Sequence, residues 1–323
     1  MHRRHLTRLA LVLGAAWLPS AALAQAFPSK PIRIVLPFGA GGVADLTART
    51  VAAKVAEGLG QSVVIENRPG AGGVAAGDAV AKADPDGHTL LLMSNGTAVS
   101  AGLFKSLPFD TLKDFAPIST LGYFDIAVVV PANSRFRSLQ ELTAYARSNP
   151  GKLNIATINV GSTQNLAAEL FKTSAGIDAQ IVPFNGTPAV VTALRGGQVD
   201  AAVEILGPVM TQIKGDGLRA LAVTGDKRAA VLPEVPTAKE AGVANFNVAS
   251  WNGLAAPAKT PRPVIDRLHK EVAAALAAPD IKKKLAELNV EAQASTPEQA
   301  AALLASEVKR WGDVIVRAKV PLQ

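Results

Sequence analysis

The chain contains no cysteine, and only 5% of its 323 residues are aromatic. The missing thiols exclude disulfides, thiol nucleophiles and thiolate metal sites. The formal net charge of +7 is modest, and the 33 basic residues are scattered rather than gathered in one segment. A nucleic-acid-binding face needs a basic cluster, often with aromatic platforms for the bases. The composition therefore argues against nucleic acid as a partner.

Groups with recognisable catalytic patterns are also scarce. Beyond the N-terminal segment the histidines are His88 and His269, and neither has a Ser/Asp partner pattern. The sequence has no G-x-S-x-G elbow, no H-E-x-x-H motif, and no carboxylate pair with a spacing typical of acid/base chemistry. We expect no metal site, no cofactor and no enzymatic activity. An exported enzyme acting on an organic acid remains open as the alternative.

No apolar run approaches the ~18 uninterrupted residues that a membrane helix requires. The N-terminus instead has a basic start, an apolar stretch over residues 9–18, and the small-x-small sequence "ALA" ending at Ala24. This order predicts an export signal over residues 1–24 that is cleaved after Ala24. General secretion is favoured over twin-arginine export because the consensus around the arginine pair is poor. We therefore expect the mature protein in the periplasm.

Strand-like runs and helical stretches alternate through most of the chain. "PIRIVLPF" precedes "ADLTARTVAAKVAEGLG", and "LNIATI" precedes "TQNLAAELFKTSAG". Such alternation predicts an α/β protein with mostly parallel sheets and helices on both faces. Two sheets fit the length better than one, because ~250 residues approach the limit of a single core. From about residue 261 helices follow one another, with only "VEAQA" between them, so they must pack on an existing sheet.

The stretch "PFGAGGVADLTAR", which follows the strand-like "IRIVL", fits the dinucleotide fingerprint G-x-G-x-x-G/A at residues 39–44. Glu66, after "SVVIE", stands where a ribose-binding carboxylate would be expected. Export argues against this interpretation, because no pool of NAD or ATP is maintained beyond the inner membrane. A dinucleotide protein stays open as a hypothesis that stabilisation by NAD would support.

Small or polar turns precede four predicted helices, at residues 38–45, 94–97, 157–163 and 185–188. A helix N-terminus presents unbonded backbone amides and a positive dipole end. Several of them converging on one crevice would hold a carboxylate without any arginine. Ordinary capping explains each turn taken alone.

Several sequence blocks resemble, in order and spacing, the substrate-binding proteins of tripartite tricarboxylate transporters, also called Bug receptors. The resemblance runs from about Phe27 to the C-terminus. It is carried by "PSKPIRIVLPFGAGGVADLTAR", "GQSVVIENRPGAGG", "ADPDGHTLLL", "LPFDTLKDFAPIS", "VPFNGTPAVVTALRGGQVD", "LRALAVTGDKRAAVLPEVPTAKEAG" and "WNGLAAPAKTPRPVIDRL". It implies a two-domain periplasmic binding-protein fold of type II-like connectivity, with two sheets, flanking helices and a hinge of two crossovers.

The resemblance also implies the domains and the site. Domain 1 is expected over residues 27–124 plus 249–323, and domain 2 over residues 125–248. A small organic acid would bind in the interdomain cleft, and the monomeric receptor would deliver it to a membrane permease. The expected ligand-binding residues, including those at the helix starts, are Phe38, Ala40, Gly41, Gly42, Asp45, Ser94, Asn95, Thr157, Asn159, Ser162, Thr163, Asn185, Gly186 and Glu204.

Some positions depart from the family pattern and bear on the ligand. Residues 157–159 read Thr-Ile-Asn where relatives often have Ser-Ser-Gly, and Glu204 replaces a shorter aspartate. Glu204 would repel a second carboxylate unless it contacts an amino group or hydroxyl. Tyr123 and Phe124 lie at the first crossover, where either one of these side chains faces the cleft or both pack in the hinge. We expect a monocarboxylate, or a small acid with an apolar or aromatic body, rather than citrate. Asp45 stabilises the first helical turn or binds a ligand ammonium.

Overall fold

The computed structural model describes residues 27–317 and 320–323, so the expected export signal and its cleavage site lie outside the described residues. Ten strands form one hydrogen-bonded sheet in the order β2-β1-β3-β9-β4-β7-β5-β6, with β8 and β10 also paired to β4. The strands are β1 (Ile32–Leu36), β2 (Val63–Asn67), β3 (Thr89–Ser94), β4 (Phe115–Pro131), β5 (Leu153–Ile158), β6 (Ala179–Phe184), β7 (Ala201–Ile205), β8 (Leu218–Val223), β9 (Ala249–Pro257) and β10 (Val290–Ala292).

The long strand β4 divides this sheet into two parts. Up to Asp125 it pairs with β9, and from Ile126 it pairs with β7. We call the part containing β1, β2, β3, β9 and β10 the first lobe, and the part containing β5, β6, β7 and β8 the second lobe. The chain returns to the first lobe through residues 224–248, beside β4, because Thr224 N donates to Ile126 O at 2.9 Å. Two crossovers therefore run side by side between the lobes.

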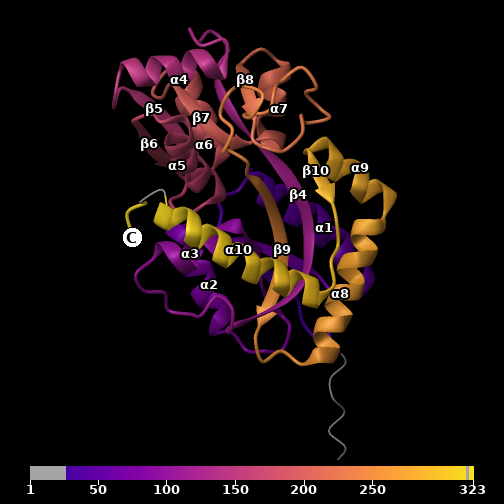
Figure 1. Cartoon of the computed structure of the whole chain (residues 1–323). Helices are drawn as coiled ribbons and strands as arrows, with labels where there is room; N and C mark the ends of the chain where they lie inside the picture. Colours follow the sequence, from indigo (N-terminus) through magenta and orange to yellow (C-terminus); the bar gives the residue numbers. More distant parts are fainter. Residues whose placement is uncertain (1–26, 318–319) are drawn as a thin grey trace, which may run out of the picture.

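Helices flank both parts of the sheet. Figure 1 shows α4 to α7 grouped with the strands of the second lobe, whereas α10 lies across β9 and β4 of the first. The helices are α1 (Val43–Leu59), α2 (Val74–Ala81), α3 (Asn95–Leu103), α4 (Leu139–Ser148), α5 (Thr163–Ala175), α6 (Thr187–Arg195), α7 (Leu206–Lys214), α8 (Arg262–Ala277), α9 (Pro279–Glu287) and α10 (Pro297–Arg317). No described helix is long and apolar enough to cross a membrane.

The C-terminal helices pack on the first lobe. The sequence predicted packing on an existing sheet, because almost no strand-like segment separates these helices. Along α10 the buried side chains Leu304, Trp311 and Ile315 recur at helical spacing and form one apolar stripe. This stripe packs against α3 and β4. The indole N–H of Trp311 donates to the carboxylate of Glu307 at 2.9 Å, so the polar atom of this fully buried ring is paired.

The expectation of mostly parallel strands is wrong. The strands β1 and β5 pair in parallel with their neighbours, but β4 is antiparallel to β7, β8, β9 and β10. The physical reason is the pair of crossovers: the chain leaves the first lobe along β4 and returns toward β9, so these strands run in opposite directions.

Candidate functional site

The glycine turn after β1 brings the first lobe against the second. A Cβ added at Gly39 would lie 3.1 Å from the carbonyl oxygen of Asn185, and one at Gly41 would lie 3.3 Å from Cγ of Pro188. Gly41 also has φ +83°, which favours glycine. The backbone conformation therefore favours glycine at position 41, and the close approach of the second lobe favours glycine at position 39.

Asp45 holds this turn in place. Its carboxylate is 3% exposed and accepts hydrogen bonds from Gly41 N at 3.1 Å and from Asn67 Nδ2 at 3.0 Å, while Arg49 forms an ion pair with it at 2.9 Å. Burial alone would raise the pKa of Asp45, but the hydrogen bonds from Arg49, Gly41 and Asn67 outweigh it and lower the pKa. Asp45 is engaged by the protein itself and orders the turn that precedes α1.

The other predicted turns also cap helices. Ser94 Oγ accepts from Gly96 N at 3.0 Å and completes a capping box with Thr97 at the start of α3. Ser162 Oγ accepts from Asn165 N at 3.1 Å at the start of α5. The turns thus place the N-termini of α1, α3, α5 and α6 at the ends of β1, β3, β5 and β6.

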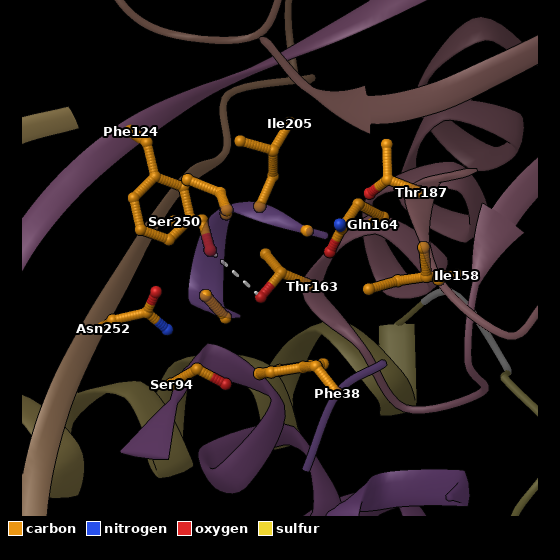
Figure 2. A pocket seen from close by; sticks show the side chains of 14 residues that line it. Phe38, Ser94, Phe124, Ile158, Thr163, Gln164, Thr187, Ile205, Ser250 and Asn252 are labelled. Atoms are coloured by element: carbon orange, nitrogen blue, oxygen red, sulfur yellow. Dashed lines mark hydrogen bonds between the residues drawn. The ribbon is translucent and has the colours of Figure 1, made fainter. Parts of the chain in front are cut away.

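These N-termini meet at one cavity between the lobes (Figure 2). The lining mixes apolar and neutral polar groups, and none of these residues carries a charged side chain. It consists of Phe38, Gly42, Val43, Ala44, Ser94, Phe124, Ile158, Thr163, Gln164, Gly186, Thr187, Ile205, Ser250 and Asn252.

Direct contacts join the lobes around this cavity. Ser250 Oγ of β9 and Thr163 Oγ1 of α5 form a hydrogen bond of 3.3 Å across it, drawn as the dashed line in Figure 2. Nearby, Gly72 N of the first lobe donates to Val160 O of the second at 2.8 Å. The two lobes are therefore in direct contact around the cavity.

Glu204 lies behind the cavity wall. It is fully buried, and its Oε2 accepts from Ile205 N at 2.9 Å, from Thr187 Oγ1 at 3.2 Å and from Gln164 Nε2 at 3.4 Å. Oε1 has no hydrogen-bond partner. Burial raises the pKa of Glu204 to about 7, against the lowering effect of those three hydrogen bonds. Glu204 therefore positions two side chains that line the cavity.

The structure brings some of the predicted site residues to the cavity and leaves others outside its lining. Phe38, Gly42, Ser94, Thr163 and Gly186 line it. Asn159 lines a smaller neighbouring cavity of about 230 Å³. The predicted residues outside both linings are Ala40, Gly41, Asp45, Asn95, Thr157, Ser162, Asn185 and Glu204.

Several of these outlying residues have structural partners. Asn95 Nδ2 donates to Ala249 O at 2.9 Å and so ties α3 to the start of β9. Thr157 Oγ1 accepts from Asn165 Nδ2 at 3.3 Å. Glu66, the carboxylate of the dinucleotide hypothesis, forms ion pairs with Arg33 at 2.9 Å and with Arg68. Its charge is therefore already balanced within the protein.

Sequence reasoning missed four polar residues of the lining: Gln164, Thr187, Ser250 and Asn252. Thr187 lies inside the predicted turn at residues 185–188 but was not included among the ligand-binding residues, and Gln164 directly follows the predicted residue Thr163. Asn252 belongs to the block "WNGLAAPAKTPRPVIDRL", which carried the family resemblance without being assigned a role. Of the two aromatics at the crossover, Phe124 lines the cavity, whereas Tyr123 lies along an open groove beside β10.

Among the described residues, no group of three or more histidine, aspartate or glutamate side chains is arranged to hold a metal ion.

Residues 47–320 match the family described as tripartite tricarboxylate transporter family receptor. The chain is 39% identical over 319 residues to a UPF0065 protein of a Pseudomonas species, and the match covers 98% of this chain and 95% of that protein. Both matches extend across the two lobes and the crossovers between them.

Solved structures of similar proteins share the fold. The periplasmic binding protein BugD superposes with a TM-score of 0.88 at 32% identity, covering 92% of this chain and all of that one. MatC from Rhodopseudomonas palustris with bound malate gives 0.84 at 34% identity, over 90% of this chain and all of that one. A second R. palustris protein, with adipate, gives 0.88 at 32% identity, over 92% of this chain and all of that one.

Proposed function

The chain belongs to the tripartite tricarboxylate transporter receptor family, and from this premise we propose that it captures a small organic acid in the cavity between its lobes. In this role it is a periplasmic solute-binding receptor rather than an enzyme. Two of the similar structures hold malate and adipate, which supports a carboxylate as the ligand.

The observation that carries this proposal is the convergence of four helix N-termini on one enclosed cavity. The starts of α1, α3, α5 and α6 contribute Gly42, Ser94, Thr163 and Thr187 to its lining. Backbone amides and helix dipoles there favour an anion, and they explain how a carboxylate is bound although no arginine or lysine lines the cavity. One such N-terminus is ordinary capping, whereas four around one cavity form a site.

We propose that binding is coupled to closure of two domains, residues 27–124 plus 249–323 and residues 125–248. The change of partner along β4 between Asp125 and Ile126, and the return of the chain beside it, support these boundaries. Hinge closure would bring the glycine turn onto residues 185–188 and form the Ser250–Thr163 hydrogen bond over the ligand. The predicted site residues outside the cavity lining would contribute to ligand binding indirectly, by holding the turns before the helices in place.

The rest of the proposal concerns the setting. The receptor would be exported with cleavage after Ala24, act as a monomer in the periplasm, and deliver its ligand to a membrane permease of the tripartite tricarboxylate type. The ligand would have an apolar or aromatic body rather than three carboxylates, because Phe38, Phe124, Ile158 and Ile205 line the cavity and cationic side chains do not.

A thermal-shift screen of the protein prepared from the periplasm tests this function. Monocarboxylic, dicarboxylic and aromatic acids should raise the unfolding temperature, since a ligand that binds only the folded state stabilises it. Native mass spectrometry of the freshly purified protein should show one co-purified acid per chain. Stabilisation by citrate and by no other acid would contradict the proposed ligand class, and chemical conversion of a bound acid would favour an enzyme.

A further inference from the structure

Asn252 lines the cavity with a side-chain amide that forms no hydrogen bond within the described residues. It lies in β9, paired with Ser94 of β3 on one side and Gly122 of β4 on the other, so its backbone is fixed by a central strand. The side chain is fully buried, and neither Oδ1 nor Nδ2 has a hydrogen-bond partner. Buried amides are almost always hydrogen-bonded, so an amide with both atoms unpaired indicates a partner that the chain does not supply.

The other polar side chains of the lining are already engaged within the protein. Ser94 caps α3, and Ser250 and Thr163 bond to each other across the lobes. Gln164 and Thr187 both donate to Glu204. Among the described residues that line the cavity, Asn252 is the one whose side-chain donor and acceptor are both buried and both without a partner.

The direction of the side chain follows from its strand. Residues two apart in a strand share a face, so Asn252 points to the same side of β9 as Ser250, whose hydroxyl bonds across the cavity. Figure 2 shows the amide of Asn252 beside Ser94, on the opposite side of the cavity from Gln164 and Ile158. The free amide thus faces the space that a ligand would occupy.

The chemistry of an amide selects what it pairs with. A hydroxyl or a carboxamide both donates and accepts, and it satisfies Oδ1 and Nδ2 together. An ionised carboxylate only accepts, so it would leave Oδ1 unpaired and would be repelled by its partial charge. Among the residues that the structure describes, no cationic side chain lines the cavity to balance a second ionised group.

We propose that Asn252 is a ligand-contacting specificity residue that selects acids carrying, besides the carboxylate bound at the helix N-termini, a second polar group that is uncharged. The ligands are hydroxy acids or acid monoamides rather than acids with two ionised carboxylates. This inference rests on the proposed receptor function and narrows its ligand class.

Two series of acids of matched length test the inference by isothermal titration calorimetry. One contains hexanoate, ω-hydroxyhexanoate, adipate monoamide and adipate, and the other contains the corresponding four-carbon acids. The wild-type protein should bind a hydroxyl- or amide-ended acid about tenfold more tightly than the methyl-ended and dicarboxylate members of the same series. In Asn252→Leu this preference should disappear, whereas the affinity for the methyl-ended acid should be kept or improved.

Asn154→Leu is the matched control, because it makes the same change on β5 away from the cavity lining. It should retain the wild-type preference. If Asn252→Leu does not fold, Asn252→Ala replaces it. The unliganded Asn252 variant should unfold at or above the wild-type temperature, because the substitution removes unpaired buried atoms.

The outcomes separate the two proposals. Suppose that acids bind the wild-type protein, but the Asn252 substitution lowers the affinity for every acid of a series by the same factor or leaves all affinities unchanged. That result would overturn the specificity role of Asn252 alone. A wild-type preference for the dicarboxylates would also overturn it. If no acid of either series binds the wild-type protein, the receptor function for such acids fails and the inference falls with it.

Discussion

At the scale of single residues, the candidate site separates into groups that face the cavity and groups that hold those in place. Asp45 and Glu204 are both buried carboxylates, but their pKa values shift in opposite directions. Asp45 has a cationic partner in Arg49, whereas the donors to Glu204 are neutral. A buried carboxylate without a cation favours its protonated form.

Glu204 should therefore make the stability of the protein depend on pH. Its pKa is raised from an ordinary value of 4.5 to about 7 in the folded protein, so the folded state binds the proton more tightly than the unfolded state does. The free energy of unfolding that this protonation contributes is fully present below pH 4.5 and is lost as the pH rises through 7. Glu204→Gln, which mimics the protonated form, should match the wild type near pH 5 and exceed it by about 2 kcal/mol at pH 8. Urea unfolding at both pH values measures this difference.

The control for Glu204→Gln is Glu234→Gln, the same change at an exposed position. It should leave the pH profile of the wild type unaltered. An equal stability of Glu204→Gln and the wild type at pH 8 would show that Glu204 is accommodated as a charged group, and the proposed cause of the raised pKa would be wrong.

At the scale of secondary-structure elements, the proposed closure of the cavity depends on the approach of the glycine turn to the start of α6. Gly39 does not adopt a left-handed backbone conformation, so its backbone accepts alanine. The obstacle to alanine is steric, because an added Cβ would lie 3.1 Å from the carbonyl oxygen of Asn185 in the other lobe. The same turn in an open arrangement would meet no such obstacle. The contact therefore belongs to closure rather than to the folding of either lobe.

Gly39→Ala should weaken ligand binding and leave the unliganded fold intact. Crowding of this kind costs roughly 1–3 kcal/mol, which corresponds to an affinity loss of about tenfold or more. Calorimetry with an acid that binds the wild type gives the affinity, and thermal unfolding without ligand gives the stability. Gly312→Ala in α10, where an added Cβ meets nothing within 4 Å, is the control and should bind normally.

A markedly lower unfolding temperature of unliganded Gly39→Ala would contradict this assignment. It would mean that the two lobes stay packed together without ligand, so that the turn is part of a permanent interface.

At the scale of the whole molecule, the proposed hinge would let one lobe rotate against the other about the two crossovers. A ligand held by both lobes favours the closed arrangement over an open one, because it contacts both walls of the cavity only when they are together. The absence of cysteine is useful here, since any introduced thiol is labelled without background.

Spin labels at Ala53→Cys on α1 and Arg195→Cys on α6 should report closure. Both positions are exposed, one in each lobe. Addition of a binding acid should shift the measured distance distribution to shorter values and narrow it, as pulsed electron resonance would record. A control pair within the first lobe, Ala53→Cys with Lys270→Cys on α8, should not change. An unchanged distance between the lobes on ligand addition would refute a hinge mechanism.

Local chemistry was largely readable from the sequence. The glycine turn, the capping residues Ser94 and Ser162, and the alternation of strands and helices are encoded within short windows, because they depend on neighbours in the chain. The four helix starts could be found in this way, and so could Phe38 and Thr163 as residues of the lining. The resemblance to a receptor family also rests on such blocks, and the family is confirmed.

The tertiary structure decided which side chains face the ligand. Thr163 and Ser250 meet although they lie 87 positions apart, and Asn252 reaches the cavity only because β9 returns between β3 and β4. The same packing brought Asn67 to Asp45 and placed Glu204 behind Gln164 and Thr187. The sequence by itself determined the turns that present backbone amides, since those depend on local conformation. The position of the cavity wall that β9 contributes, with Ser250 and Asn252, depends on long-range strand pairing, so only the folded molecule decided it.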